Sequence, residues 1–242
     1  MSRGRQRVEF ASGFVLHQRP FRDSSLIVEI FTREHGRMTT FARAARGPRA
    51  RFQGLRPFQQ LLLSWSGRGD APQLTGAEFD GAPTTLPSAH LLSAYYLNEL
   101  LIKLTAQHDP HPEIFDLYRQ TLSRLAAERQ IEAVLRSFER QLLESLGFGL
   151  ELRCEESGGP PVRPDAYYQF HAGSGLRLCE PTADAYAGRL LLQLAQDQAI
   201  EDQQQLRQAR ALMRAAIDHC LEGRDLATRA VARAVARMER MA

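Results

Sequence analysis

The 242-residue chain has little of several residue types that commonly mark a function. Its three cysteines are too few for a disulfide framework in a chain of this length, and a sparse, odd count is typical of a reducing cytosol. Its only lysine is Lys103, so no phosphate-binding loop of the G-x-x-x-x-G-K-S/T type occurs. The most apolar stretch, residues 91–104, contains charged residues and is too short to span a bilayer. No apolar stretch follows the basic start, so we expect a cytoplasmic protein without signal peptide or membrane partner.

Motifs of catalysis are also missing. No H-E-x-x-H or G-x-S-x-G sequence occurs, and the seven histidines are scattered along the chain. The acidic residues form no paired pattern of the kind that holds catalytic magnesium. We therefore expect no enzymatic activity and no cofactor.

What the chain does have is arginine, and it is distributed unevenly. Thirty of the 31 basic residues are arginine. Residues 1–56 carry twelve arginines against four acidic residues, a net charge of +8, while residues 57–242 carry a net charge of −5. This asymmetry indicates a polyanionic partner for the N-terminal part of the chain.

Five short strands are expected in the N-terminal third, because runs of β-branched and aromatic residues alternate there with turn signals. Their expected ranges are 8–17, 26–31, 38–41, 59–65 and 74–79. Five strands in so short a segment favour a small closed barrel. The OB-fold is the commonest five-stranded version that binds nucleic acid, and an SH3-like barrel fits the same periodicity.

Helices are expected in most of the remaining chain, once Pro83 and Pro87 end the strand-rich region. Their expected ranges are 88–106, 113–128, 131–146, 183–195, 202–221 and 226–240. Residues 150–183 are rich in glycine and proline and predict a small irregular insert. We predict an α+β protein with an N-terminal five-stranded OB-fold barrel, residues 1–82, and a helical domain, residues 83–242, that contains this insert.

The strongest candidate site is an arginine-rich loop. Five arginines fall within residues 43–56 without an acidic residue among them, and Gly47, Pro48 and Gly54 favour a loop. Arginine binds phosphate oxygens in bidentate geometry, and Phe52 could stack on a base. The alternative is a solvated loop that pairs with acidic residues elsewhere.

Further arginines on the expected barrel, including Arg33, could extend the loop into one positive face or be scattered over the surface. The residues predicted to contact DNA are Arg19, Arg22, Arg37, Arg43, Arg46, Arg49, Arg51, Phe52 and Arg56.

A second candidate site lies on the helix expected at residues 131–146. Arg136 and Arg140 are four residues apart and share a face beside an apolar stripe that includes Phe138. A basic rim beside apolar side chains suits an acidic peptide that ends in a hydrophobic residue and a carboxylate. The alternative is pairing with acidic residues of the same helix, namely Glu132, Glu139 and Glu144.

The cysteines suggest a degenerate zinc-ribbon-like insert. Cys154 precedes Ser157 by three positions, and Cys179 precedes Thr182 by three, so each C-x-x-C pair has lost its second sulfur. Serine and threonine are poor zinc ligands, and we expect a metal-free remnant. Cys220 is expected to be a small core residue.

Several segments, in this order, resemble the bacterial recombination mediators of the RecO family. They are Phe14-Val15-Leu16-His17 with Arg19-Pro20-Phe21, Phe31-Thr32 with Gly36-Arg37, the arginine loop ending at Leu55 with Pro57-Phe58, Tyr95-Tyr96-Leu97-Asn98-Glu99-Leu100, Arg136 with Phe138-Glu139, and Leu146-Gly147-Phe148-Gly149. The resemblance covers about residues 8–158.

The resemblance implies an OB-fold and a helical domain, binding to single- and double-stranded DNA, and annealing of complementary strands. It also implies binding to the acidic C-terminal tail of the single-stranded-DNA-binding protein SSB and cooperation with RecR in loading RecA, which places the protein at the nucleoid. Some members carry a four-cysteine zinc site, and this chain departs from them by keeping Cys154 and Cys179 only. An RNA-binding OB-fold factor and a nuclease subunit remain alternatives.

Overall fold

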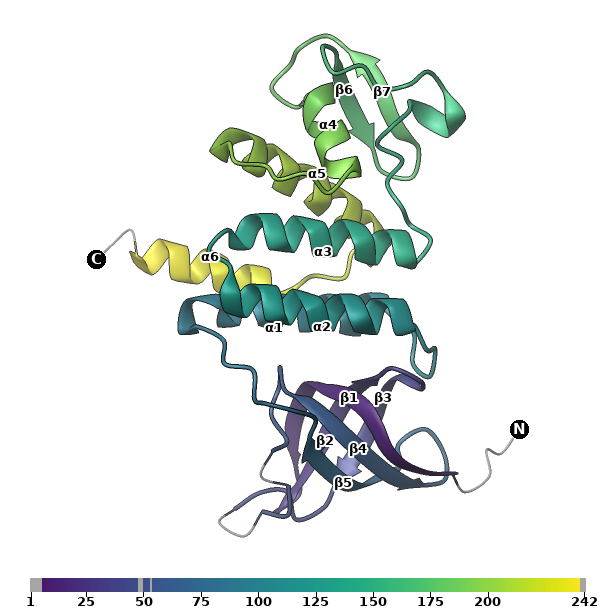
Figure 1. Ribbon diagram of the computed structural model, residues 1–242, viewed down its shortest axis with the longest axis vertical. Helices are drawn as coiled ribbons and strands as arrows, with labels where there is room; N and C mark the ends of the chain where they lie inside the picture. The colour runs from purple at the N-terminus through teal and green to yellow at the C-terminus, as the bar shows by residue number, and fades with distance from the viewer. Residues whose placement is uncertain (1–5, 48–49, 53, 240–242) are drawn as a thin grey trace. The chain divides into compact units, whose positions relative to one another are not determined.

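The computed structural model describes residues 6–47, 50–52 and 54–239, which form two compact units (Figure 1). The first unit runs to Ala127 and resumes at Leu226, and the second comprises Glu128–Asp225. The expected α+β class is confirmed, because strands dominate the N-terminal part of the chain and helices dominate the rest.

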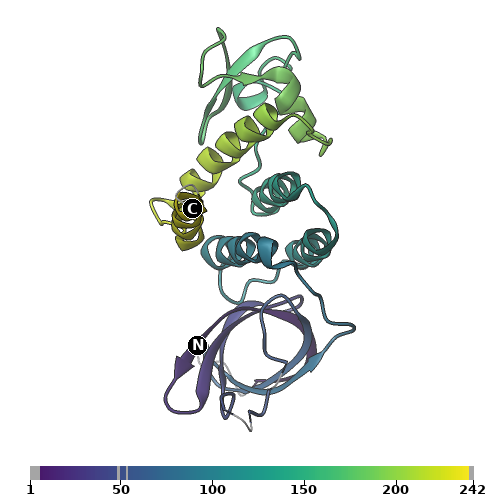
Figure 2. The same ribbon diagram turned by 90° about the vertical axis from the view of Figure 1, so that its left-hand side faces the viewer.

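The N-terminal strands close into a barrel, as the view along it shows (Figure 2). The strands are β1 (Gln6–Phe21), β2 (Ser25–Thr32), β3 (Gly36–Ala42), β4 (Gln60–Gly67) and β5 (Gln73–Phe79). Their order is β1-β2-β3-β5-β4, with β1 also pairing β4, and the β3–β5 pair is parallel while the other pairs are antiparallel. The OB-fold expected from the sequence is therefore confirmed.

Alternation along the strands fills the barrel with apolar side chains, since every second residue points inward. Its buried core includes a fully buried tryptophan and two residues of the β3–β4 loop. The members are Ala11, Val15, Val28, Ile30, Met38, Ala42, Phe52, Leu55, Leu61, Leu63, Trp65 and Leu74.

The outer wall of β1 and β2 is also apolar, and two helices of the same unit pack on it. The short 3-10 helix η1 (Ser88–His90) leads into α1 (Leu91–Leu104), and α2 (Pro112–Ala127) follows. The ring of Phe14 lies 5.3 Å from that of Phe115 and 5.0 Å from that of Tyr118, and Phe31 lies 5.8 Å from Phe115. These contacts attach α2 to the barrel wall.

A buried polar chain attaches α1 to the same wall. Asn98 donates from Nδ2 to the carbonyl oxygen of Leu16 at 2.8 Å, and it accepts from the Tyr118 hydroxyl at 2.5 Å. Burial raises the pKa of Tyr118, so its hydroxyl keeps the proton that this bond needs. The chain satisfies polar groups that would be costly to leave unpaired in the interior.

The turn between β2 and β3 packs closely against the loop between α1 and α2. Gly36 has φ of +66°, and a Cβ there would overlap the backbone of Asp109. His108 donates its backbone N–H to the carbonyl oxygen of Arg37 at 2.8 Å. Glycine is needed at position 36 both for its backbone conformation and for this close approach.

The last helix, α6 (Ala227–Glu239), returns to the first unit and packs beside α1 (Figure 1). Glu99 of α1 accepts hydrogen bonds from the backbone N–H groups of Ala227 and Thr228 at 2.7 and 2.9 Å. The start of α6 is thus anchored by a residue far away in the sequence.

The second unit combines three helices with a small sheet. It contains α3 (Ile131–Ser145), the 3-10 helix η2 (Glu156–Gly158), β6 (Tyr167–His171), β7 (Gly175–Cys179), β8 (Tyr186–Ala187), α4 (Gly188–Ala195) and α5 (Gln203–Leu221). The sheet order is β7-β6-β8, so the segment expected to be an irregular insert has a three-stranded sheet. Tyr168 and Leu176 of this sheet join residues of α4 and α5 in one core. The zinc-ribbon-like character of the insert stays a prediction.

The predicted domains at residues 1–82 and 83–242 stay a prediction, and the compact units group the elements in another way. The first unit joins the barrel to α1, α2 and α6 rather than ending after β5. The physical reason is the apolar outer wall at Phe14, Leu16 and Phe31, which is buried under helices that follow the barrel in the sequence.

Candidate nucleic-acid interface

The arginine-rich loop connects β3 to β4 and begins against the β1–β2 turn. Pairing of Leu26 with Ala42 brings the start of β2 beside the end of β3. The carbonyl oxygen of Ser24 then accepts from the backbone N–H groups of Ala45 and Arg46, at 2.8 and 3.1 Å. These two bonds fix the beginning of the loop against the turn.

The consequence is a cluster of three exposed arginines from two segments. Arg22 lies in the turn, and Arg43 and Arg46 lie in the loop. The guanidinium of Arg46 donates to the carbonyl oxygen of Arg22 at 3.5 Å, and that of Arg22 lies 5.2 Å from the ring centre of Phe21. We refer to Arg22, Arg43 and Arg46 as the arginine cluster.

Arg51 is exposed and held on the other side of the loop. Its backbone N–H donates to the carbonyl oxygen of Ala44 at 2.8 Å, which closes this part of the loop. Its guanidinium donates to the carbonyl oxygen of Thr75 on β5 at 3.0 Å. Arg51 therefore extends the basic surface from the β1–β2 turn towards β5.

The sequence also predicted DNA contacts for Arg19, Arg49 and Arg56. Arg19 is exposed on β1, two residues before the end of that strand, and is the β-sheet partner of Ile27 on β2. Arg56 is exposed at the far end of the loop. Arg49 lies outside the described residues.

One basic residue near the cluster was missed from the sequence. Arg68 is exposed in the β4–β5 hairpin, and Phe41 at the end of β3 donates its N–H to Pro72 of the same hairpin at 3.0 Å. A surface hollow is lined by Ser66, Gly67, Arg68, Ala71, Pro72 and Gln73. Only the closure of the barrel brings this hairpin beside β3, so sequence spacing gave no signal.

Phe52 does not have the exposed position that base stacking requires. Its side chain is 7% exposed and belongs to the barrel core, with Leu55 of the same loop. The guanidinium of Arg51 lies 5.3 Å from its ring centre. The prediction of a stacking aromatic is corrected, because the loop folds back and uses Phe52 to fill the barrel.

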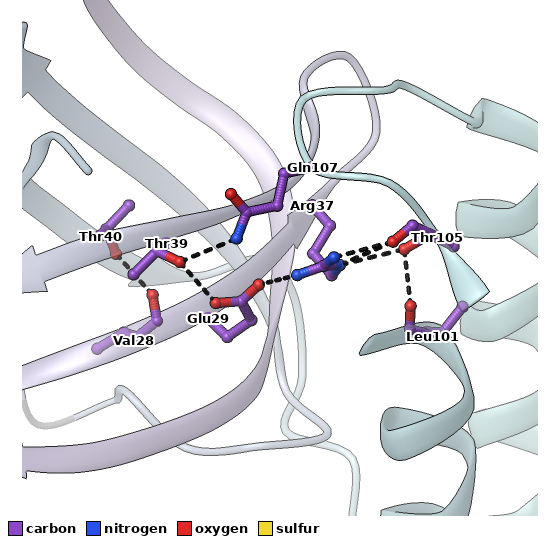
Figure 3. Close-up of polar contacts among 8 residues, drawn as sticks. All are labelled: Val28, Glu29, Arg37, Thr39, Thr40, Leu101, Thr105 and Gln107. Carbon is purple, nitrogen blue, oxygen red and sulfur yellow. Dashed lines mark hydrogen bonds and ion pairs between the residues drawn. The ribbon is translucent and has the colours of Figure 1, made fainter. Parts of the chain in front are cut away.

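Arg37 is likewise removed from the predicted DNA contacts, since its guanidinium joins the barrel to α1 (Figure 3). It pairs with Glu29 on β2 and donates to the carbonyl oxygen of Thr105 at 2.9 Å. Glu29 also accepts from Thr39 at 2.8 Å. The Arg37 side chain is 12% exposed and the Glu29 side chain 14%, so this network is largely buried.

Arg33 also turns towards the helices. It pairs with Asp116 of α2 at 3.0 Å, and this contact raises the pKa of Arg33. The single positive face considered for the barrel arginines is therefore not continuous. Arg33 and Arg37 contact helical segments, while Arg22, Arg43 and Arg46 gather at the β1–β2 turn.

Comparisons with known proteins agree with this architecture. The family model described as "Recombination protein O N terminal" matches residues 9–80, and "Recombination protein O C terminal" matches residues 89–230. The chain belongs to the RecO family. It is 45% identical over 242 residues to the DNA repair protein RecO of Alkalilimnicola ehrlichii, covering 98% of this chain and 95% of that protein.

Two further relatives have similar coverage. The DNA repair protein RecO of Methylococcus capsulatus is 42% identical over 224 residues, with 92% of each chain covered. That of Coxiella burnetii is 41% identical over 227 residues, covering 93% of this chain and 97% of the relative. A role in DNA repair and recombination follows from membership of the RecO family.

The proposed peptide site on α3 is occupied by ion pairs in this RecO family member. Arg136 contacts Glu139 at 2.6 Å and Glu132 at 3.4 Å, and its side chain is 7% exposed. Arg140 contacts Glu144 at 2.7 Å and also pairs with Asp197, which follows α4.

The pairing within the helix that the sequence offered as the alternative is therefore present. Phe138 is buried and presents little surface to a peptide. A carboxylate ligand would have to compete with the existing acidic partners of both arginines.

The three cysteines are partly buried. Cys154 and Cys179 are partly buried free thiols, and no group of three or more potential metal ligands occurs among the residues that the structure describes. Cys220 is partly buried on α5, and burial raises the pKa of its thiol. No helix in the described ranges is long and apolar enough to cross a membrane.

Proposed function

We propose that this RecO family member binds single- and double-stranded DNA through the basic surface of its OB-fold. The surface consists of the arginine cluster together with Arg51, with Arg19, Arg56 and Arg68 as its extensions. The observation that carries the proposal is the pair of hydrogen bonds from Ala45 and Arg46 to Ser24, which gathers exposed cations from separate segments. Exposed guanidinium groups gathered in this way suit the phosphates of a nucleic-acid backbone.

The mechanism is electrostatic and needs no catalytic group. Each arginine that contacts a phosphate releases condensed counterions, and this release favours binding whatever the base sequence. Neutralising the phosphates of two strands on one protein reduces their repulsion, so complementary bases can meet and pair. Asp23 in the β1–β2 turn and Asp70 in the β4–β5 hairpin are exposed and limit the positive potential locally. We infer that annealing arises from this neutralisation.

The partners implied by the resemblance form a second part of the proposal. They are the SSB C-terminal tail, RecR and, indirectly, RecA, acting at the nucleoid in the cytoplasm. Arg136, Phe138 and Arg140 remain the proposed tail-binding residues, on the condition that the tail carboxylate displaces the acidic partners of the arginines. The basic surface of the barrel is the proposed DNA site, so the two ligands have different sites.

The decisive experiment is an annealing assay with complementary oligonucleotides coated with SSB. The wild-type protein is compared with Arg22→Ala/Arg43→Ala/Arg46→Ala and with Arg189→Ala/Arg207→Ala/Arg214→Ala, which removes three exposed arginines of the second unit. We expect annealing to be lost in the first variant and retained in the control. Equal activity of both variants would remove the arginine cluster from the DNA site.

Two alternatives are tested in the same experiment series. RNA competing for the protein as well as single-stranded DNA does would favour an RNA-binding role, because both polymers offer phosphates. Magnesium-dependent cleavage of the oligonucleotides would favour a nuclease role. We expect neither result.

A further inference from the structure

Helix α6 exposes a row of large apolar side chains. Val231 is 50% exposed, Val235 42% and Met238 70%. Their spacing of four and three residues places them along one edge of the helix. Exposed apolar residues that adjoin one another are a feature of protein–protein contact sites.

A second row, of arginines, runs along the other edge of the exposed side. Arg229, Arg233 and Arg237 are spaced four residues apart, and Arg233 and Arg237 are exposed. At about 100° per residue, the exposed Arg233 and Arg237 lie roughly 150° around the helix from the apolar row, which is nearly half a turn. The exposed alanines Ala230 and Ala234 lie between the two rows.

The remaining side of α6 packs within the first unit. Thr228, Ala232 and Ala236 are partly buried and share one side of the helix, and α6 contacts α1. Glu99 holds the first turn through three hydrogen bonds from Ala227 and Thr228. The helix is therefore fixed before any partner arrives, which lowers the entropic cost of binding.

We propose that the exposed side of α6 binds an amphipathic helix of a partner protein, one that carries an apolar row beside an acidic row. The small alanines allow the axis of a second helix to approach closely. The apolar row of the partner would cover Val231, Val235 and Met238, and its carboxylates would meet Arg233 and Arg237. This surface differs from the arginine cluster and goes beyond the proposed DNA binding.

Charge complementarity excludes the simplest other occupants. In an antiparallel pair of two copies, equivalent edges of facing helices lie on the same side, so both arginine rows would repel each other. A nucleic-acid backbone would satisfy the arginines but leave the apolar row exposed to water. An acidic amphipathic helix satisfies both rows together, since its apolar side chains cover the apolar row and its carboxylates meet the arginines.

The test uses the full-length protein and a labelled synthetic helical peptide of about 18 residues, or five turns. The peptide carries leucines along one edge and glutamates along the next, and a scrambled peptide of equal composition is the reference. Binding is measured by fluorescence anisotropy. The proposal expects the designed peptide to bind at least about tenfold more tightly than the scrambled one, a difference of about 1.4 kcal/mol.

Two double variants test the apolar row and the arginine row separately. Val231→Ser/Val235→Ser and Arg233→Glu/Arg237→Glu should each weaken the peptide about tenfold or more, while Arg207→Glu/Arg214→Glu on α5 should not. A peptide with lysines in place of glutamates should recover affinity for Arg233→Glu/Arg237→Glu. This rescue excludes misfolding as the cause of the loss, and thermal unfolding checks the serine variant.

Four results would overturn the proposal. The first is equal binding of the scrambled and the designed peptide, and the second is a peptide affinity that neither the serine nor the glutamate variant changes. The third is binding of vesicles of phosphatidylcholine and phosphatidylglycerol in place of the peptide. The fourth is self-association that Val231→Ser/Val235→Ser abolishes. Failure here leaves the DNA proposal intact, because oligonucleotide titration of the same variants is a separate measurement.

Discussion

The carboxylate of Glu99 on α1 accepts two hydrogen bonds from Thr228, from its backbone N–H at 2.9 Å and from its hydroxyl at 2.6 Å, across 129 positions of sequence. The first N–H groups of a helix have no partner within the helix and usually bond to a side chain just before it. In α6 a residue of another helix takes this role, and its negative charge also suits the positive end of the helix dipole.

Replacing Glu99 by alanine should loosen α6. The expected loss is about 1 kcal/mol in the free energy of unfolding, which is typical for removal of a capping side chain. Hydrogen exchange of the α6 amides should accelerate, while DNA affinity should stay unchanged because the arginine cluster lies elsewhere. Glu180→Ala, at an exposed acidic residue of the second unit, is the control and should alter neither quantity.

The sequence predicted the existence of α6 but could not predict this anchor. Helix periodicity and the five barrel strands follow from local patterns, which a sequence displays directly. The bond from Thr228 to Glu99 depends on how the chain returns to α1. The same limit explains Phe52 and Arg37, since loop composition does not reveal which side chain folds inward. Arg68 was not predicted as part of the basic surface, because its hairpin comes to lie beside β3 only when the barrel closes.

The salt dependence of DNA binding tests the arginine cluster quantitatively. Arg22→Ala/Arg43→Ala/Arg46→Ala should lower the slope of log affinity against log salt by about two to three, at roughly 0.9 per lost contact for duplex DNA and 0.7 for single strands. Arg189→Ala/Arg207→Ala/Arg214→Ala should keep the wild-type slope. A slope that falls equally in both variants would mean that net charge, not the cluster, determines binding.

Phe52 should contribute to stability rather than to base recognition. Phe52→Ala is expected to lower the free energy of unfolding by about 3–5 kcal/mol, because it removes a buried ring from the barrel core. Phe52→Leu retains an apolar side chain at this position, so it should retain most of the stability and bind oligonucleotides like the wild type. Urea unfolding and oligonucleotide titration measure the two effects. A stable Phe52→Leu protein with weakened DNA binding would restore the stacking hypothesis.

Arg37 should hold the barrel to α1. Arg37→Met leaves Glu29 largely buried without its cation, and loss of one partner of such a pair costs about 3 kcal/mol of stability. Adding Glu29→Leu should recover part of this loss, because the uncompensated charge is then removed as well. A thermodynamic cycle over the two single variants and the double variant gives the coupling energy. A coupling near zero would show that the pair is unimportant, and reduced DNA affinity in the stable double variant would return Arg37 to the DNA site.

The last prediction concerns Arg136, whose two candidate roles give different results in a double variant. Arg136→Ala removes the cation that lies 2.6 Å from Glu139, a side chain that is 2% exposed. Breaking a buried pair in this way is expected to cost about 3–5 kcal/mol of stability, so weaker binding of an SSB tail peptide by this variant is ambiguous.

Arg136→Met/Glu139→Leu removes both charges and should recover most of the stability, as apolar replacements of buried ion pairs commonly do. If Arg136 binds the tail carboxylate, the stable double variant should still lose about 1.5–3 kcal/mol of peptide affinity, the size of a charge-assisted hydrogen bond. If Arg136 only neutralises Glu139, the double variant should bind the peptide like the wild type. Chemical unfolding and titration of a labelled tail peptide, with an oligonucleotide as the unaffected reference ligand, distinguish these outcomes.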